Sequence, residues 1–351
     1  MTANSWSAGP IQVLKRPGTN SIEKVHCLAY SPDGKLLAVG SSAPSLIKGN
    51  FPGEDRLPEG TIELWDLDAG KLSSTLRQSA KSENGDTFNQ VGALTFSPDG
   101  KWLVGSDVPG YTLWEVATGK QKFKWRSGMI EPLSAAWSPD GKWIGLPTMV
   151  HPDAPSYDST PHGVALVEAG TGKAKMFFPV EIGYPRAARF APDGKLLVTA
   201  GHDCTVRVFD TVGMTNVFSD FTETTMFTVG FSPDGRYFVA GPSWGGVLLI
   251  YEVGSDGGKA VIKKKGKSRS GGGEAHPLEF TPDGRFALCS SFEGIKLWDA
   301  TGWASFKMLE RGPGTLSLDG KRIALAHQAT PETIEIWSLV ELEKTLVAPR
   351  R

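Results

Sequence analysis

Two short motifs have the spacing of serine-nucleophile sites. Residues 241–245 (GPSWG) match G-x-S-x-G, the motif in which a hydrolase exposes its serine on a turn between a strand and a helix. Here Ser243 lies between two strand-like apolar segments, and no helical pattern follows it. Residues 45–48 (SLIK) match S-x-x-K but have the composition of a loop. We therefore assign no catalytic residue.

Four possible metal ligands, His151, Asp153, Asp158 and His162, lie close together in one polar segment. Their spacing fits no standard metal site, and prolines flank Asp153. Residues 66–68 (DLD) resemble the start of a calcium loop but have no distal glutamate. We predict no metal and no cofactor.

Large aromatic, histidine and arginine side chains occur in several irregular segments. These residue types carry much of the binding energy at protein interfaces. We interpret them as candidate interaction residues, with Trp244, in a turn between two glycines, as the anchor. The full set is Phe51, Arg56, His151, Tyr157, His162, Tyr184, Trp244, Phe292 and His327.

The most concentrated positive charge comprises Lys259, Lys263, Lys264, Lys265, Lys267 and Arg269. Such a run can bind phosphates or an acidic partner. Lysines on an outer strand also block edge-to-edge pairing of sheets. No aromatic residue lies between these lysines, so bases have no stacking platform. We expect no nucleic-acid partner.

The elements that position these residues follow from one repeated turn of the type Ser-Pro-Asp-Gly. Proline sets φ at the first corner, aspartate bonds its own backbone, and glycine accepts positive φ. Short apolar segments flank each copy, which predicts a β-hairpin. The seven turn aspartates are Asp33, Asp99, Asp140, Asp193, Asp234, Asp283 and Asp319.

Two further strands follow each hairpin. Residues 62–66 (IELWD) and 206–210 (VRVFD) alternate apolar and polar side chains, as a half-buried strand does. A second tight turn comes next, at residues 68–71, 117–120, 170–173 and 300–302, and a more polar strand follows it. Units of four antiparallel strands, a to d, cannot cover their own faces, so we expect them to stack into a ring.

Residues 64–66 and 297–299 (both LWD), together with the Ser-Pro-Asp-Gly turns, resemble the WD-repeat β-propeller family. The resemblance implies a seven-bladed β-propeller of four-stranded antiparallel blades that acts as a non-enzymatic protein-protein interaction scaffold. No Gly-His dipeptide precedes any strand a, and Asp203 is the best match to the family's b-c turn aspartate. We therefore interpret the chain as a divergent, bacterial-type variant.

Uneven spacing of the turns predicts insertions on one face. Asp33 and Asp99 are 66 residues apart, whereas a bare blade takes about 40 to 45. The predicted insertions, residues 41–60, 78–90, 147–162 and 265–275, fall in b-c and d-a connections. Those connections open on the same side of a propeller. This loop-rich face is the expected site of a protein or peptide partner.

The innermost strands carry small residues on one face, with two exceptions, Arg189 and Glu279. These two could line the central channel, form an ion pair or lie at a solvated rim. For ring closure we favour residues 343–347 as the outer strand of the last blade, with residues 11–15 pairing outside them or replacing them.

The composition fits a globular protein of 351 residues, which the repeat makes one domain: a propeller over residues 22–347 and an N-terminal segment, 1–21, adding to the closing blade. Basic (37) and acidic (38) residues balance, and no apolar run is long enough to span a membrane. Three unpaired cysteines favour a reducing, cytoplasmic location.

Two alternatives stay open. One is a hydrolase or lyase with a site over the channel mouth, using His151, His162, His202 or His327. The other is a structural subunit of a larger complex.

Overall fold

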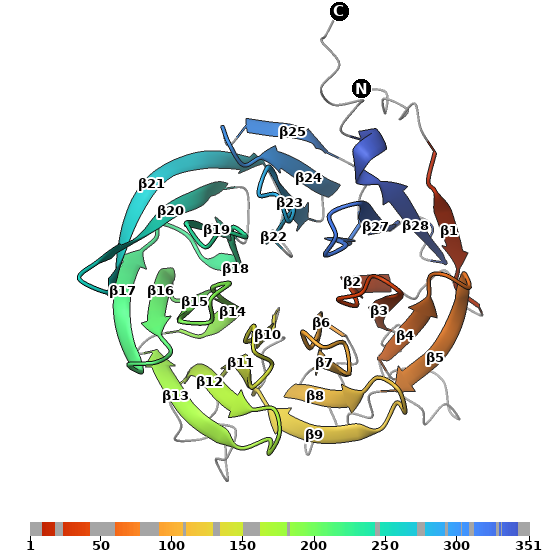
Figure 1. Ribbon diagram of the computed structural model, residues 1–351, viewed down its shortest axis with the longest axis horizontal. Helices are drawn as coiled ribbons and strands as arrows, with labels where there is room; N and C mark the ends of the chain where they lie inside the picture. The colour runs from red at the N-terminus through yellow and green to blue at the C-terminus, as the bar shows by residue number, and fades with distance from the viewer. Residues whose placement is uncertain are drawn as a thin grey trace, which may run out of the picture.

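The computed structural model describes residues 9–17, 24–42, 60–77, 91–107, 110–128, 134–149, 162–180, 183–242, 246–271, 278–291, 294–302, 304–308, 312–327, 330 and 332–342. Strands within these ranges form seven four-stranded antiparallel sheets, arranged as blades around a central axis (Figure 1). The predicted seven-bladed β-propeller is confirmed. In each blade the first strand lies nearest the axis and the last lies at the rim.

The first four blades follow the predicted order a to d. Blade 1 comprises β2 (Lys24–Tyr30), β3 (Leu36–Ser42), β4 (Thr61–Asp66) and β5 (Lys71–Arg77). Blade 2 comprises β6 (Ala93–Phe96), β7 (Trp102–Asp107), β8 (Gly110–Glu115) and β9 (Gln121–Arg126). Blade 3 comprises β10 (Ala136–Trp137), β11 (Trp143–Thr148), β12 (His162–Glu168) and β13 (Ala174–Val180). Blade 4 comprises β14 (Pro185–Phe190), β15 (Leu196–Gly201), β16 (Thr205–Asp210) and β17 (Thr215–Phe221).

The remaining blades complete the ring. Blade 5 comprises β18 (Met226–Phe231), β19 (Tyr237–Pro242), β20 (Gly246–Asp256) and β21 (Lys259–Gly271). Blade 6 comprises β22 (Leu278–Phe280), β23 (Phe286–Ser291), β24 (Gly294–Asp299) and β25 (Ala304–Met308). Blade 7 comprises β26 (Gly314–Leu316), β27 (Arg322–Ala326), β28 (Thr333–Ser338) and β1 (Gln12–Lys15).

The repeated turn sets the register of each a-b hairpin through its side chains. In blade 2 the Ser97 hydroxyl donates to Asp99 Oδ1 (2.6 Å) and accepts from the backbone nitrogen of Trp102 (3.0 Å). Asp99 also accepts from the nitrogen of Lys101 (3.1 Å), and Gly100 has a φ of 70°. Ser97 and Asp99 thus fix the first residues of the next strand.

The core consists of apolar layers between neighbouring blades. Across blades 3 and 4, for example, the rings of Phe178 and Phe209 stack with their centroids 4.3 Å apart. Trp114 and Trp298, from the third strands of blades 2 and 6, are among the largest fully buried side chains. Since each blade covers its neighbour, the ring needs no separate hydrophobic cap.

Ring closure differs from the arrangement that we favoured. The strand beside β28 is β1, with Gln12 opposite Ile336 and Lys15 opposite Thr333, so the N-terminal segment supplies the outer strand of blade 7. The chain after β28 forms a helical turn at residues 339–342. Leu339 and Leu342 pack into the core beside blade 7, which directs the chain away from the sheet. Residues 343–347 lie outside the described residues.

Polar contacts link blade 7 to blade 1 at both faces of the disc. Arg16 makes two hydrogen bonds of 2.9 Å to the carboxylate of Glu63, and Arg16 is only 4% exposed. On the side of the disc that carries the a-b turns, Arg322 Nη2 donates to the carbonyl oxygen of Gly34 (2.7 Å). Gln12 Nε2 donates to the carbonyl oxygen of Leu67 (3.0 Å). Side chains from both ends of the sequence therefore hold this junction.

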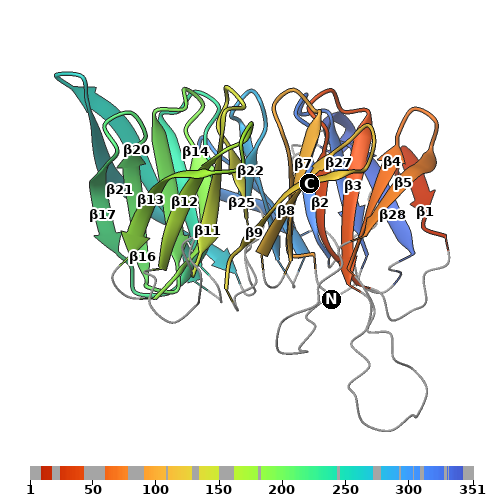
Figure 2. The same cartoon turned by 90° about the horizontal axis from the view of Figure 1, so that it is seen from below.

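The two faces of the disc differ in their connections. The a-b and c-d turns gather on one side, which we call the turn face (Figure 2). The b-c and d-a connections begin on the opposite side, which we call the loop face. Three predicted insertions fall mostly outside the described residues. The fourth, 265–275, is wrong in part because residues 265–271 belong to β21, which pairs with β20 over its whole length.

No helix among the described residues combines the length and apolar character needed to cross a bilayer.

Candidate functional site on the loop face

Three of the nine predicted interaction residues are described: His162, Tyr184 and His327. His162 begins β12, Tyr184 directly precedes β14, and His327 follows β27, so all three lie at loop-face ends of strands. The structure brings His162 and Tyr184 together but places His327 in blade 7. The other six, Phe51, Arg56, His151, Tyr157, Trp244 and Phe292, lie outside the described residues and stay predictions.

Close contact between two backbone segments positions the centre of this site in blade 4. The His202 nitrogen donates to the carbonyl oxygen of Tyr184 (2.9 Å). A Cβ atom on Gly201 would collide with that same carbonyl oxygen, and one on Gly183 would lie 2.8 Å from the backbone nitrogen of Asp203. Glycine at both positions therefore lets the d-a and b-c connections touch and brings the side chains of Tyr184 and His202 together.

A row of rings crosses three blades at this point. The Tyr184 ring lies 4.4 Å from His202 and 6.3 Å from His162, measured between centroids. His202 in turn lies 4.9 Å from Phe227, at the start of β18. The row therefore runs from blade 3 through blade 4 to blade 5. We call His162, Tyr184, His202 and Phe227, with Arg186, the ring cluster.

Arg186 adds a positive charge to the ring cluster. Its guanidinium carbon lies 4.7 Å from the centroid of the Phe227 ring, a cation–π contact. Burial raises the pKa of Tyr111, in blade 2, well above its ordinary value, and the charge of Arg186 opposes that shift. Arg186 therefore lies within electrostatic range of blade 2 as well as in contact with blade 5.

Two residues of the ring cluster occupy β-bulges. The register of β14 against β15 shifts between Pro185 and Ala187, and that of β18 against β19 shifts between Met226 and Thr228. The residues skipped are Arg186 and Phe227. A bulge turns a side chain away from the alternation of its strand, and bulges are common beside functional sites.

The b-c turn of blade 4 carries backbone strain. Cys204 has a φ of 51°, a left-handed conformation that non-glycine residues seldom adopt. Two contacts from Thr222 hold the Cys204 carbonyl, one from its nitrogen (2.6 Å) and one from its hydroxyl (2.8 Å). Asp203 forms an ion pair with Arg207, and both side chains are mostly buried. This turn is held from several directions, so it presents His202 rigidly.

Two of the histidines that the structure describes, His162 and His327, lie in different blades and form no common acid–base centre. His162 Nδ1 contacts the carbonyl oxygen of Gly183 (2.5 Å). In blade 7, His327 Nε2 lies 3.0 Å from the carboxylate of Glu335. The part of the chain that the structure describes holds no group of three or more His, Cys, Asp or Glu side chains able to bind a metal. The half-buried members of the ring cluster, His162, Tyr184, Arg186 and His202, are instead suited to ring contacts and hydrogen bonding with a bound surface, while Phe227, which is 6% exposed, supports them from below.

Arg189 and Glu279 lie on inner strands, β14 and β22, and each bonds to a neighbouring blade. Arg189 Nη1 donates to the carbonyl oxygen of Ala135 (3.2 Å), while Glu279 accepts from the Leu316 nitrogen (2.7 Å) and the Thr315 hydroxyl. Burial lowers the pKa of Arg189 and raises that of Glu279, and each shift is opposed by the other group's charge. A channel role for them stays a prediction.

Three lysines of the basic run, all on the outer strand β21, lie beside carboxylates. Lys264 Nζ lies 2.6 Å from Asp220 on β17, and Lys265 Nζ lies 3.2 Å from Glu252 on β20. Lys267 lies 3.7 Å from Glu223. These pairs tie the rim of blade 5 to itself and to blade 4, and they reduce the charge available for a phosphate.

Comparisons with known proteins agree with this architecture. Residues 10–66, 78–107 and 183–210 match the family model "WD domain, G-beta repeat". These segments are similar to WD-type repeats, in a chain that folds as a seven-bladed β-propeller. The third segment contains Gly183, Tyr184, Arg186 and His202, so much of the ring cluster lies in a matched repeat.

The individual relatives match either a small share of the chain or most of it at low identity. The small ribosomal subunit protein RACK1 of Drosophila melanogaster is 29% identical over 129 residues, which are 34% of this chain and 33% of the relative. The Cps50 (Swd1) β-propeller domain of Myceliophteria thermophila superposes with a TM-score of 0.68 at 15% identity, covering 90% of this chain and 96% of that domain. A chain of a mitotic checkpoint complex gives 0.68 at 13% identity, covering 96% and 94%. At these identities the two structures show the fold alone.

Proposed function

We propose that this protein is a non-enzymatic interaction scaffold that docks a protein or peptide partner on its loop face, with the ring cluster at the centre of the contact. The observation that carries the proposal is the row of rings across blades 3, 4 and 5 with the Arg186 guanidinium beside it. Tyrosine, other aromatic residues and arginine dominate the energetics of protein interfaces.

The rigidity of the ring cluster supports the proposal. Glycine contacts, two bulges and the strained Cys204 turn fix these side chains on the ends of strands. A preorganised surface loses little side-chain entropy when a partner binds. Propellers of WD repeats typically act as protein-interaction scaffolds, and two of the similar proteins are named as a ribosomal subunit protein and a component of a checkpoint complex.

The predicted residues beyond the described ranges extend the same proposal. Trp244 falls in sequence between the loop-face ends of β19 and β20, in the blade that contributes Phe227. We propose Trp244 as a second anchor, with Phe51, Arg56, His151, Tyr157 and Phe292 around it. The cytoplasmic location and the bacterial origin stay predictions.

Site-specific photo-crosslinking tests the ring cluster. A photoreactive phenylalanine analogue replaces Tyr184 in the full chain, which is then irradiated in host lysate. We expect discrete crosslinked proteins. Their yield is expected to fall by about tenfold or more when His202→Ala and Trp244→Ala are added. The matched control places the same analogue at Leu318, an apolar residue of the turn face that is 62% exposed.

Two results would contradict the proposal. One is the same set of crosslinked proteins from position 318 as from position 184. The other is undiminished crosslinking in the His202 and Trp244 variants, provided that their thermal unfolding matches the wild type.

A further inference from the structure

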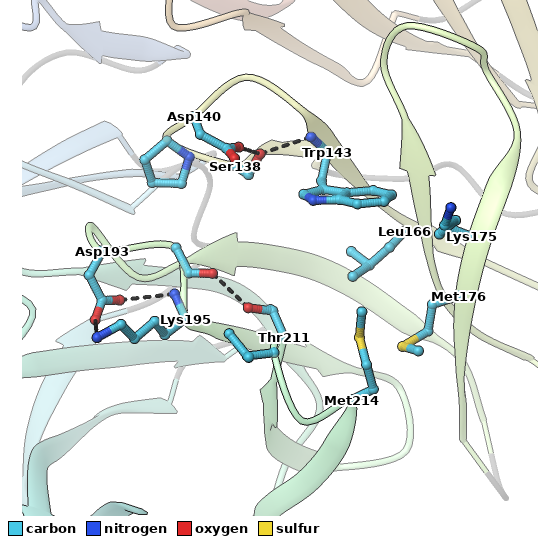
Figure 3. Close-up of a pocket in the computed structure, with 13 residues that line it drawn as sticks. Ser138, Asp140, Trp143, Leu166, Lys175, Met176, Asp193, Lys195, Thr211 and Met214 are labelled. Carbon is cyan, nitrogen blue, oxygen red and sulfur yellow. Dashed lines mark hydrogen bonds and ion pairs between the residues drawn. The ribbon is translucent and has the colours of Figure 1, made fainter. Parts of the chain in front are cut away.

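A pocket of about 470 Å³ opens on the turn face between blades 3 and 4, on the side of the disc opposite the ring cluster. It lies among the a-b turns of both blades, the start of β13 and the c-d turn of blade 4. Figure 3 shows the Trp143 indole above the pocket, Met176 and Met214 on one side, and the Asp193–Lys195 turn on the other. Its apolar walls are Trp143, Leu166, Met176, Val212 and Met214.

At the neighbouring junction, between blades 2 and 3, the same space is filled by protein side chains. There Lys122 Nζ lies 4.2 Å from the centroid of the Trp102 ring and 3.5 Å from the Ala169 carbonyl oxygen. Trp125 Nε1 donates to the carbonyl oxygen of Gly172 (2.7 Å). A Cβ on Gly172 would lie 2.6 Å from the Phe123 ring, so aromatic side chains fill the space up to the turn.

Strand registers align the two junctions residue by residue. Leu113 pairs with Phe123 in blade 2 as Leu166 pairs with Met176 in blade 3, which makes Met176 the counterpart of Phe123. By the same alignment Lys175 corresponds to Lys122. Met176 is narrower than Phe123, and Lys175 lines the pocket instead of closing over Trp143.

The c-d turn of blade 4 also differs from the c-d turn of blade 3, here by carrying larger side chains. Met214 takes the position of Gly172, and its φ of 58° lies in the left-handed region, where Gly70, Gly119 and Gly172 also lie. Val212 takes the position of Gly170 and is 76% exposed. Large apolar side chains therefore replace two glycines on the turn that borders the pocket.

Met214 combines a strained backbone with partial exposure. A left-handed conformation is unfavourable for any residue with a Cβ atom, and the side chain of Met214 remains 39% exposed. Residues with such strained backbones cluster at ligand-binding and active sites. The unbranched thioethers of Met176 and Met214 adapt to the shape of an apolar guest, as methionines do at peptide-binding surfaces.

Charge at the rim favours an acidic guest. Asp140 and Asp193 each have a nearby lysine, Lys142 at 3.3 Å and Lys195 at 3.9 Å. Lys175 has no carboxylate within ion-pair distance among the residues that the structure describes. A negative charge entering the pocket would therefore meet an ammonium group not already engaged.

We propose that this pocket binds a short segment of a partner protein that inserts one bulky apolar side chain between Trp143 and Met214 and places an adjacent carboxylate beside Lys175. The volume lies within the range of ligand pockets and accommodates such a side chain with its flanking backbone. Because the pocket and the ring cluster lie on opposite faces, the propeller can hold two partners at once.

Panning a displayed library of random heptapeptides on the full chain tests the proposal. We expect the wild type to enrich peptides with a bulky apolar residue next to Asp or Glu, and Met214→Gly to enrich none of them. An enriched peptide is then titrated into protein carrying ¹³C-methyl methionine. The methyl signals of Met176 and Met214 are expected to shift, and Lys175→Glu to weaken binding about tenfold or more.

The controls keep the outcome interpretable. Lys122→Glu changes the counterpart lysine at the filled junction and is expected to leave affinity within about twofold. Glycine suits the backbone at position 214, so Met214→Gly should still fold. Enrichment without an apolar–acidic pair, equal enrichment on Met214→Gly, or methionine signals that do not move would overturn the proposal.

Discussion

Backbone bulges decide the surroundings of particular side chains on the inner strands. His26 lies at the bulge of β2, between Val25 and Cys27, the counterpart of Arg186 in blade 4. Its Nε2 lies 2.6 Å from the Ser42 hydroxyl. Burial, and second the positive charge of Lys24, lower the pKa of His26 from 6.5 to about 4.

The lowered pKa predicts acid sensitivity. Between pH ~6.5 and ~4 the unfolded chain binds a proton at His26 that the folded chain does not, so stability is lost as the pH falls through this window. We expect the free energy of unfolding to fall by about 2 kcal/mol from pH ~7 to ~5 through this group.

Urea denaturation at several pH values, comparing the wild type with His26→Gln, measures that contribution. Glutamine retains a hydrogen-bonding group near Ser42 but does not titrate. Equal pH dependence in the two proteins would show that His26 does not titrate as described.

At the scale of the element, the a-b turns share one pattern of hydrogen bonds, with an exception in blade 4. Six of the seven turns begin with Ser or Thr, whose hydroxyl donates to the turn aspartate and accepts from the first residue of strand b. Blade 4 has Ala191 instead, and Asp193 accepts only from the nitrogen of Lys195 among the described contacts. The turn of blade 4 therefore has two fewer hydrogen bonds.

Ala191→Ser is expected to raise the free energy of unfolding by about 1 kcal/mol, because the hydroxyl can bond both Asp193 and the nitrogen of Leu196. The reciprocal change, Ser97→Ala, is expected to lower it by about the same amount. Chemical denaturation of both variants checks the pair. A destabilised Ala191→Ser would mean that the hydroxyl does not reach these partners.

For the whole molecule, the junction of blades 7 and 1 controls stability because it joins the two ends of the chain. Breaking a buried ion pair leaves a charge without a partner, so we expect Arg16→Met to cost about 3 to 5 kcal/mol. The double variant Arg16→Met with Glu63→Gln should recover part of this loss, since glutamine can still accept from Trp65 Nε1, which lies 3.0 Å from Glu63.

Denaturation of the three proteins, with Lys101→Met as a control, checks this expectation. Lys101 lies 3.4 Å from Asp99, but both side chains are mostly exposed, so its loss should cost less than about 1 kcal/mol. A single Arg16 variant no less stable than the control would show that the ring is closed by other contacts.

Local chemistry made the architecture predictable from the sequence. Proline, aspartate and glycine specify a tight turn through φ and short hydrogen bonds, and alternation specifies a strand, so seven copies specify seven blades. Tyr184 and His162 are candidate interaction residues from the sequence because aromatic and histidine side chains in irregular segments are visible there, and their binding role stays a prediction.

Only the tertiary structure decided which residues meet. Arg186 and Phe227 escaped prediction because a bulge breaks the period of two on which a sequence argument depends. Ring closure by β1 depends on where Leu339 and Leu342 pack, and the pocket at Met214 depends on how well two blades fill their common space. Contacts between distant segments set all three, and no local pattern encodes them.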